Sequence, residues 1–377
     1  MAGRFDVIVL GVGTMGAAAC RALAERGVRV LGLDARAIPH EAGSHHGQSR
    51  LFRLAYYEHP DYVPLLKRAH ALWLEMNQRA GADVFRQTGA VFAGPPEGEL
   101  VPGSLASARA HGLAHRDLDA ATLRREFPLF ALPERFVGLW EPTAGYVAPE
   151  LAVATMAEQA MVAGAEIHGH EPAVRWSAMP PCVRVETTRG VYEAGSLVIA
   201  AGAWSGKVMQ HLGVPLVVTR QALLWTDPTR RDRFTLGRFP CWAVEAPDGH
   251  AYYGFPIDER GPGLKSARHW RATPTDPDHV DRTITTADEQ EVRGFLRAHL
   301  PAGDGPTLAV RTCLYTNSPD LHFVIGLHPG HTNVAVACGF SGHGFKFAPV
   351  IGEVLADLAT RGTTMHPIGL FDLQRFA

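Results

Sequence analysis

Apolar residues form three successive patterns near the start of the chain. The run at 6–10, DVIVL, is almost wholly apolar and predicts a buried strand. Small and apolar residues then recur with helical spacing over 14–27, and Gly27 is a stop signal for that helix. A second apolar run at 28–34 predicts another strand. This order of strand, helix and strand predicts a βαβ unit with parallel strands.

Similar patterns return along the chain. Apolar positions spaced by three and four residues predict helices over 62–81 and 149–169. Apolar or alternating runs predict strands at 173–177, 182–187 and 190–202. The C-terminal part, 333–359, reads as a buried strand, a glycine-rich turn and a helix.

These patterns predict an α/β and α+β protein with two domains. We expect a Rossmann-like nucleotide-binding domain assembled from separated segments, because its strand and helix patterns recur at both ends of the chain. A substrate domain built on an antiparallel or mixed sheet is inserted between those segments. The expected boundaries are 1–84, 141–215 and 311–377 for the nucleotide-binding domain, and 85–140 and 216–310 for the substrate domain.

Composition narrows the class of protein. The 377 residues are 46% hydrophobic and 20% charged, which is ordinary for a soluble enzyme. A formal charge of −2 gives no electrostatic reason to expect nucleic acid or a membrane surface as a partner. The five cysteines are scattered without C-x-x-C spacing, which argues against a disulfide framework or a metal site. With no apolar run long enough to span a membrane, we expect a cytoplasmic protein.

The turn after the first strand has the spacing of a dinucleotide-binding motif. Gly11 allows a tight turn, Gly13 lets the backbone approach a pyrophosphate, and Gly16 lets the helix pack closely on the strand. Thr14 and Met15 complete the turn, where helix amides favour phosphate. Asp34, at the end of the second strand, can accept hydrogen bonds from ribose hydroxyls and would repel a 2′-phosphate. The motif does not choose between FAD and NAD.

Other glycines and cations suggest further contacts with anions. Gly202 ends a second apolar strand, where a glycine would let the backbone come close to the cofactor a second time. If 43–53 begins a helix, Arg50 and Arg53 lie on one face and require an anion; the alternative is a solvated basic face. Gly342, Gly344 and Lys346 precede a helix, which is either an anion site or a simple helix cap.

Five blocks of sequence resemble one family, the amine-oxidising flavoenzymes that include monomeric sarcosine oxidase and N-methyltryptophan oxidase. They are FDVIVLGVGTMG, GSHHGQSR, YYGFP with the following GLK, CLYTNSPD and GFSGHGFKF, and they span nearly the whole chain. The resemblance implies FAD attached covalently through its 8α-methyl group to Cys313. The other four cysteines lie in helix or strand patterns where small buried residues are expected.

The resemblance also implies roles for individual residues. Arg53 and Lys346 would hold the substrate carboxylate, close to Gly342. Lys265 would promote the reaction of oxygen near flavin N5, although taken alone it reads as a solvated lysine near a turn, and His269 as a surface histidine. Residues implied around the flavin face and substrate are Arg50, His46, Tyr253, His269 and Tyr315. Further implied cofactor contacts are Ser44, His45, Arg50, Val174, Gly202, Gly342, Gly344 and Lys346.

The implied reaction is oxidation of an N-methyl amino acid such as sarcosine by O₂, in a monomeric enzyme, giving the demethylated amino acid, formaldehyde and hydrogen peroxide. Departures from the family pattern in GQSR, IDERGPG and CWAVEAPDG leave the substrate side chain open. N-methyl-L-tryptophan and a pipecolate-like cyclic imino acid are the alternative substrates. An NAD-dependent dehydrogenase, or a nucleotide-binding protein without catalysis, is the alternative from a different class.

Overall fold

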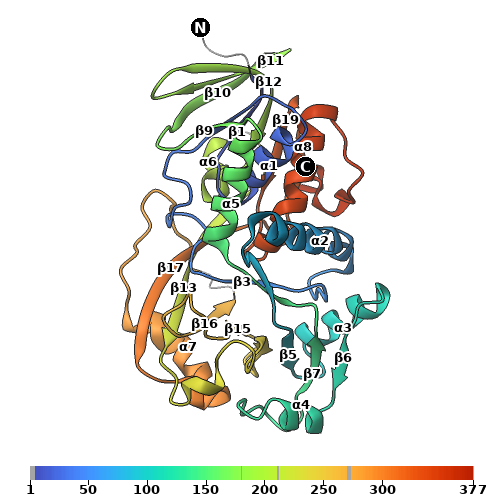
Figure 1. Cartoon of the computed structure of the whole chain (residues 1–377), viewed down its shortest axis with the longest axis vertical. Coiled ribbons are helices and arrows are strands. Elements are labelled where there is room, and N and C mark those ends of the chain that lie inside the picture. Colours follow the sequence, from blue (N-terminus) through green and yellow to red (C-terminus); the bar gives the residue numbers. More distant parts are fainter. Residues whose placement is uncertain (1–4, 180, 210–211, 270–272, 377) are drawn as a thin grey trace.

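The computed structural model describes residues 5–179, 181–209, 212–269 and 273–376. Its first sheet contains the predicted βαβ unit (Figure 1). β1 (Phe5–Leu10) lies parallel to β2 (Val30–Leu33) and to β12 (Val191–Ile199), which brings the carboxyl ends of three strands together. The other strands of this sheet are β9 (Glu166–His168), β10 (Ala173–Met179), β11 (Cys182–Thr187), β18 (Val324–His328) and β19 (His331–Cys338).

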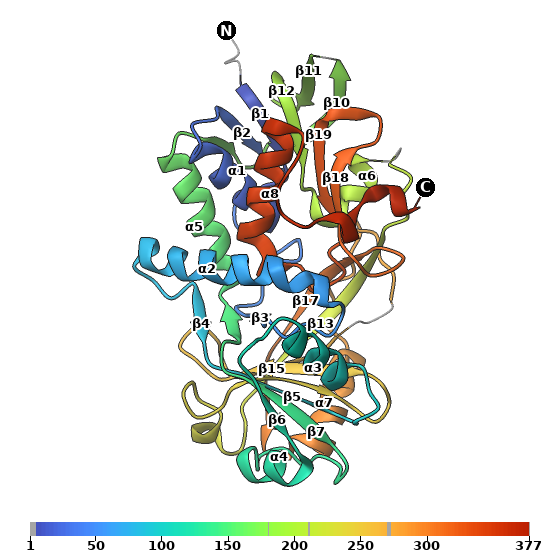
Figure 2. The same ribbon diagram turned by 90° about the vertical axis from the view of Figure 1, so that its right-hand side faces the viewer.

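Helices cover one face of the first sheet. α1 (Thr14–Ala24), α5 (Pro149–Val162) and α8 (Ala348–Arg361) pack side by side over it, and α2 (Val63–Ala80) crosses below them (Figure 2). These helices agree with the predicted helical segments, because their apolar residues are the ones that the sheet and neighbouring helices bury. A short helix, α6 (Ser205–Val208), follows β12.

The second sheet is mixed and forms the lower half of Figure 1. All its neighbouring strands are antiparallel except β14 and β5, which are parallel. In order the strands are β17 (Thr307–Asn317), β13 (Val217–Thr226), β16 (Leu264–His269), β15 (Ala251–Phe255), β14 (Cys241–Glu245), β5 (Ala90–Gly94), β7 (Val137–Glu141) and β6 (Arg116–Leu118). Its helices are α3 (Leu100–Ala110), α4 (Ala120–Glu126) and α7 (Thr286–His299). The expected combination of α/β and α+β architecture is confirmed.

A small third sheet consists of β3 (Arg50–Phe52), β8 (Gly145–Val147) and β4 (Phe85–Gln87). A helix within 43–53 was the condition for placing Arg50 and Arg53 on one helix face, and it is not met, because the backbone of Arg50–Phe52 pairs with β8. The expected domain boundaries at 310/311 and 140/141 fall inside β17 and β7. The division of the chain into domains stays a prediction.

The four cysteines other than Cys313 differ in how deeply they are buried. Cys20, Cys241 and Cys338 are buried, as expected for small apolar positions, whereas Cys182 is half-buried at the start of β11. Within the described ranges, His, Cys, Asp and Glu side chains form no group of three or more suited to a metal ion. No helix in that part of the chain is both long and apolar enough to cross a membrane.

Candidate active site

A cavity of about 440 Å³ lies at the carboxyl ends of β1 and β2, beside the start of α1. This is where open parallel sheets bind nucleotides. Twelve of the residues singled out in the sequence line it: Gly11, Gly13, Thr14, Met15, Asp34, Ser44, His45, Arg50, Gly202, Tyr315, Gly342 and Gly344. Val174 does not line it; that side chain is exposed, and the preceding Pro172 and Ala173 form the wall instead.

Asp34 ties the glycine turn to the second strand. Its Oδ2 accepts a hydrogen bond from the Val12 amide at 2.8 Å, and its Oδ1 accepts one from the Arg36 amide at 2.9 Å. Gly16 lies against the turn so closely that a Cβ there would be 1.7 Å from the Gly11 carbonyl oxygen. The first turn of α1 carries no acidic side chain, so its free amides can receive a phosphate group.

A second cavity, of about 70 Å³, adjoins the first. Arg50, Tyr315, Gly342 and Phe345 line both, so a ligand in one lies next to a ligand in the other. Four more of the predicted residues line the smaller cavity, namely Arg53, Tyr253, His269 and Lys346. The remaining lining residues were missed in the sequence: Leu51, Tyr57, Glu58, Leu100, Ala243, Ala251, Tyr252, His343 and Phe345.

Arg53 and Lys346 are the buried cations of this smaller cavity. Nη2 of Arg53 donates to both carboxylate oxygens of Glu58, at 2.7 and 2.6 Å. Nζ of Lys346 donates to the His343 carbonyl oxygen at 2.7 Å. Burial, followed by repulsion from Arg53, lowers the pKa of Lys346 to about 7. Lys346 can therefore gain or lose its charge near neutral pH.

His45 of the larger cavity, His269 of the smaller one, and His46, which lines neither, are all neutral at pH 7. Burial lowers the pKa values of His45, His46 and His269 to about 3, and the charge of Arg50 adds to this effect at His45 and His46. Nδ1 of His269 lies 3.4 Å from the Tyr315 hydroxyl. Neutral imidazoles and phenols thus line a site that also contains Arg50, the Arg53–Glu58 pair and Lys346, whose charge depends on pH.

Cys313 lies on β17 directly behind the wall of the larger cavity. Its side chain is 1% exposed, and Sγ accepts a hydrogen bond from Arg50 Nη2 at 3.3 Å. Sγ also lies 3.6 Å from the Ser44 carbonyl oxygen. Both of these neighbours line the cavity, as does the next residue but one, Tyr315.

Lys265 is buried on β16, in contrast to the solvated lysine that its local sequence suggests. It is 2% exposed, and Nζ donates to the carbonyl oxygens of Gly47 at 2.5 Å and Ser49 at 2.7 Å. Nζ also lies 4.9 Å from the centre of the Phe255 ring. Burial and the nearby Arg50 lower its pKa well below the usual value. Lys265 lines neither cavity and reaches the backbone of the loop between them.

Comparison with known proteins gives a consistent set of relatives. The family described as FAD dependent oxidoreductase matches residues 6–358. The chain is 44% identical to the monomeric sarcosine oxidase of Streptomyces avermitilis over 384 residues, covering 100% of this chain and 99% of that one. It is 36% identical to the N-methyl-L-tryptophan oxidase of Salmonella newport over 376 residues, covering 99% of this chain and 100% of that one.

A similar solved structure is that of NikD, an unusual amino acid oxidase essential for nikkomycin biosynthesis, in its open form. The TM-score is 0.84 at 25% sequence identity, and the match covers 98% of this chain and 97% of that one. The similarity of fold therefore extends over both large sheets.

Proposed function

The chain belongs to the FAD dependent oxidoreductase family, and from this premise we propose that it is an oxidase of an N-methyl amino acid, with sarcosine as the first candidate. The products would be the demethylated amino acid, formaldehyde and hydrogen peroxide. Because the family depends on FAD, the glycine motif is explained without a nicotinamide cofactor, and an NAD-dependent dehydrogenase is no longer the better alternative. The observation that carries the proposal is the small cationic cavity sharing a wall with the cofactor cavity.

The residues of the larger cavity fit FAD. Asp34 and the glycine turn suit the adenosine and pyrophosphate, and a Cβ at Gly342 would lie 2.2 Å from the Tyr315 ring, so this wall has no room for a side chain. When bound, FAD would accept two electrons from the substrate and pass them to oxygen. We propose Cys313 as its covalent attachment point, because Sγ contacts Arg50 and Ser44, which both line the cavity.

Attachment has a direct test. Protein precipitated with acid should retain its yellow colour, and a digest should contain a flavin-bearing peptide that includes Cys313. A Cys313→Ser variant should release FAD on precipitation. Complete release of the flavin from the unaltered protein would contradict the covalent bond and leave the rest of the proposal in place.

Arg53 and Lys346 would bind the substrate carboxylate, the arginine through its fork and the lysine as a point charge. Because the Arg53 fork already contacts Glu58, an incoming carboxylate must share or displace that partner. The cationic surroundings disfavour a protonated substrate amine, which has to be neutral before it can be oxidised. Tyr253 and Tyr315 line the cavity and exclude water from the reacting carbon. Lys265 is proposed to stabilise negative charge as oxygen is reduced.

The size of the smaller cavity favours a small substrate. Its volume of about 70 Å³ is well below the roughly 300–1,000 Å³ of ordinary ligand pockets. A methyl group and a carboxylate are closer to this size than an indole ring is. We therefore propose sarcosine ahead of a cyclic imino acid such as pipecolate, and both ahead of N-methyl-L-tryptophan.

Peroxide release in air, measured with these three compounds and with glycine as a primary amine, tests the proposed activity. The highest kcat/KM should be with sarcosine. Preference for N-methyl-L-tryptophan would overturn the substrate assignment. Failure of every secondary amine to yield peroxide would overturn the oxidase.

We also propose that the protein acts in the cytoplasm as a monomer. All five cysteines are free, which agrees with a reducing compartment. Light scattering during gel filtration should give the mass of one chain; a dimer would contradict this part of the proposal.

A further inference from the structure

One short segment, 47–55, passes both cavities and carries Arg50 and Arg53. Its central part is β3, which pairs with β8 in antiparallel register, Arg50 opposite Val147 and Phe52 opposite Gly145. Segment 141–150 therefore runs alongside segment 47–55 in the opposite direction. A glutamate stands at each end of segment 141–150.

Glu150, in the first turn of α5, holds the beginning of segment 47–55. Its Oε1 accepts hydrogen bonds from the amides of Gly47 at 2.6 Å and Gln48 at 3.1 Å, and Oε2 lies 3.2 Å from the Gln48 amide. Gly47 and Gln48 have φ values of 101° and 69°, so the turn lies in the left-handed region. The carboxylate is the partner that satisfies two successive amides of this unfavourable turn.

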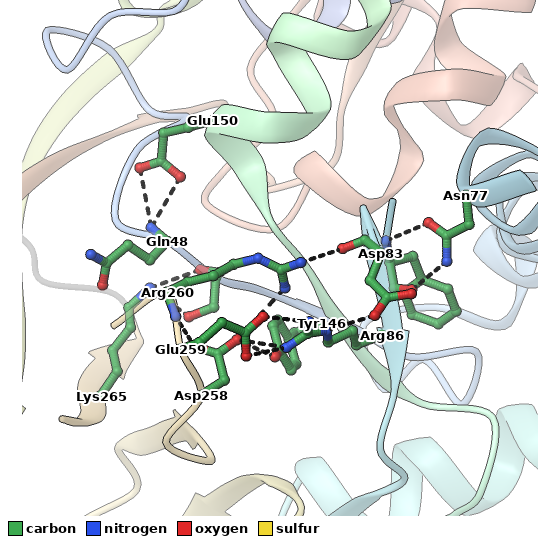
Figure 3. Close-up of polar contacts among 12 residues, drawn as sticks. Gln48, Asn77, Asp83, Arg86, Tyr146, Glu150, Asp258, Glu259, Arg260 and Lys265 are labelled. Atoms are coloured by element: carbon green, nitrogen blue, oxygen red, sulfur yellow. Dashed lines mark hydrogen bonds and ion pairs between the residues drawn. The ribbon is translucent and has the colours of Figure 1, made fainter. Parts of the chain in front are cut away.

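Lys265 contacts the same turn by donating to the carbonyl oxygens of the turn. Nζ contacts the oxygens of Gly47 and Ser49, so a carboxylate takes the amides while an ammonium takes the carbonyls. Figure 3 shows Glu150 on one side of Gln48 and Lys265 on the other. The residue after this turn is Arg50, whose guanidinium reaches the Cys313 thiol.

Glu141, the last residue of β7, holds the other end of segment 47–55. It is 0% exposed, and its two oxygens accept the amides of Leu54 at 2.7 Å and Ala55 at 3.0 Å. Thr143 Oγ1 donates to Glu141 Oε1 at 2.9 Å. The carbonyl oxygen of Ala55 in turn accepts Arg53 Nη1 at 3.0 Å. Glu141 thus acts on the backbone that orients Arg53.

We propose that Glu141 and Glu150 are positioning residues that fix the two ends of segment 47–55 and act on different parts of the site. Glu150 sets Arg50 and Lys265 toward the cofactor, and Glu141 sets Arg53 toward the substrate carboxylate. This inference rests on the proposed function, since it assumes FAD in the larger cavity and a carboxylate in the smaller one.

The chemistry requires a carboxylate at both positions. Each glutamate presents two acceptor oxygens to neighbouring amides, whereas a glutamine would turn an NH₂ group toward one of those N–H donors. One buried backbone amide would then lack an acceptor, and the segment would shift to satisfy that amide. Aspartate keeps the charge and both acceptors but is shorter by one methylene group.

The experiment compares Glu150→Gln, Glu141→Gln and a control, Asp288→Asn. Asp288 is also a buried carboxylate that binds a backbone amide, that of Thr285 at 2.9 Å, and an arginine, Arg220 at 2.7 Å, but it lines neither cavity. Three readouts are needed for each protein. They are the melting temperature, the fraction of flavin retained after acid precipitation, and the Kd of acetate measured by calorimetry with excess FAD.

The two glutamates should separate the readouts. Glu150→Gln should lower flavin retention at least about threefold and leave the acetate Kd within about twofold. Glu141→Gln should raise the acetate Kd about tenfold and leave flavin retention unchanged. Asp288→Asn should lower the melting temperature without changing either binding readout. Glu150→Asp and Glu141→Asp should show the same separation to a smaller extent, and they serve if a glutamine variant does not fold.

Equal losses of flavin retention and acetate affinity in both variants would overturn the inference, since they would indicate general damage to the site. No loss in either variant would also overturn it, since the glutamates would then act like Asp288, on stability alone. The unaltered protein distinguishes this result from failure of the proposed function. If it binds neither FAD nor acetate, the proposed function is wrong. If it binds both and the variants do not separate, only the positioning roles are wrong.

Discussion

At the scale of single residues, the site is a balance of buried charges. Arg53 is paired with Glu58, whereas Nζ of Lys346 donates to the carbonyl oxygen of His343, and the pKa of Lys346 is about 7. The charge available to a ligand carboxylate therefore depends mainly on Lys346. Because burial lowers this pKa, the group is charged below pH 7 and increasingly neutral above it.

This dependence predicts how acetate binding varies with pH. The acetate Kd should be constant below about pH 7 and rise by up to about tenfold per pH unit above it, until the raised pKa of Lys346 in the complex is reached. Calorimetry across this range measures the profile, and acetate avoids the titration of a substrate amine. A Lys346→Met variant should bind weakly with a flat profile. A rising profile that persists in Lys346→Met would assign the titration to another group.

The role proposed for Lys265 is separate and concerns the reaction with oxygen. Replacing it with methionine keeps most of its volume but removes the buried hydrogen-bond donor Nζ, so we expect flavin reoxidation to slow by roughly a hundredfold. The rate at which substrate reduces the flavin should change far less. Rapid mixing of reduced enzyme with oxygenated buffer measures reoxidation. Lys67→Met, on an exposed part of α2, is the matched control. Reoxidation of Lys265→Met at the rate of the unaltered protein would remove this role.

Many residues of the site could be predicted from the sequence, but their burial and their hydrogen-bond partners could not. Lys265 and His269 look solvated from their neighbours alone, since burial depends on strands far apart in the sequence. Glu58, Glu141 and Glu150 were missed because their partners are an arginine fork and backbone amides, which leave no pattern in the sequence. Only a likeness to known proteins could point to these positions.

At the scale of elements, local patterns succeeded where local interactions decide the structure. The βαβ unit, α2, α5 and α8 follow from apolar periodicity and stop signals. β3 could not be predicted in this way, because its three residues are extended only by pairing with β8 almost a hundred residues away. From the sequence, a helix there is only a condition for placing Arg50 and Arg53 on one face.

α3 places a hydrophobic side chain in the smaller cavity. Glu245 accepts the amides of Glu99 at 2.9 Å and Leu100 at 2.8 Å, which fixes the start of the helix. Leu100 itself lines the cavity. This element therefore sets the space available for a substrate side chain.

A Leu100→Ala variant should change substrate preference. The enlarged cavity should raise the ratio of kcat/KM for pipecolate to that for sarcosine, at a cost of about 2–5 kcal/mol in the free energy of unfolding. Peroxide release and urea unfolding measure the two effects. Leu105→Ala, also on α3 but not lining the cavity, should leave the ratio unchanged. An unaltered ratio in Leu100→Ala would mean that α3 does not limit the substrate.

At the scale of the whole molecule, the cofactor cavity joins the two large sheets. Its walls include Gly11 and Asp34 from the first sheet's loops, and Leu314 and Tyr315 from β17 of the second sheet. A ligand that fills it contacts both layers. This arrangement also explains why the expected domain boundary near Cys313 cuts a strand, since the proposed attachment residue lies in the second sheet.

Binding of FAD should therefore stabilise the entire chain. With Cys313→Ser, which cannot form the bond, free FAD at 100 times its Kd should add about 2.7 kcal/mol to the free energy of unfolding and raise the melting temperature in one transition. FMN, which lacks the adenosine half that Asp34 would bind, should give a smaller shift. Thermal melts over a range of FAD and FMN concentrations measure both. Equal shifts would contradict the assignment of the Asp34 end to adenosine.

The central claim is that a secondary amino acid reduces a flavin bound in the larger cavity and that oxygen then reoxidises it. Its most direct test is the visible absorbance of the purified protein mixed with one equivalent of sarcosine per flavin in the absence of oxygen. The account predicts that the flavin absorbance is lost, and that readmitted air restores it with an equimolar amount of hydrogen peroxide. Flavin absorbance that persists with sarcosine, pipecolate and N-methyl-L-tryptophan alike would contradict it.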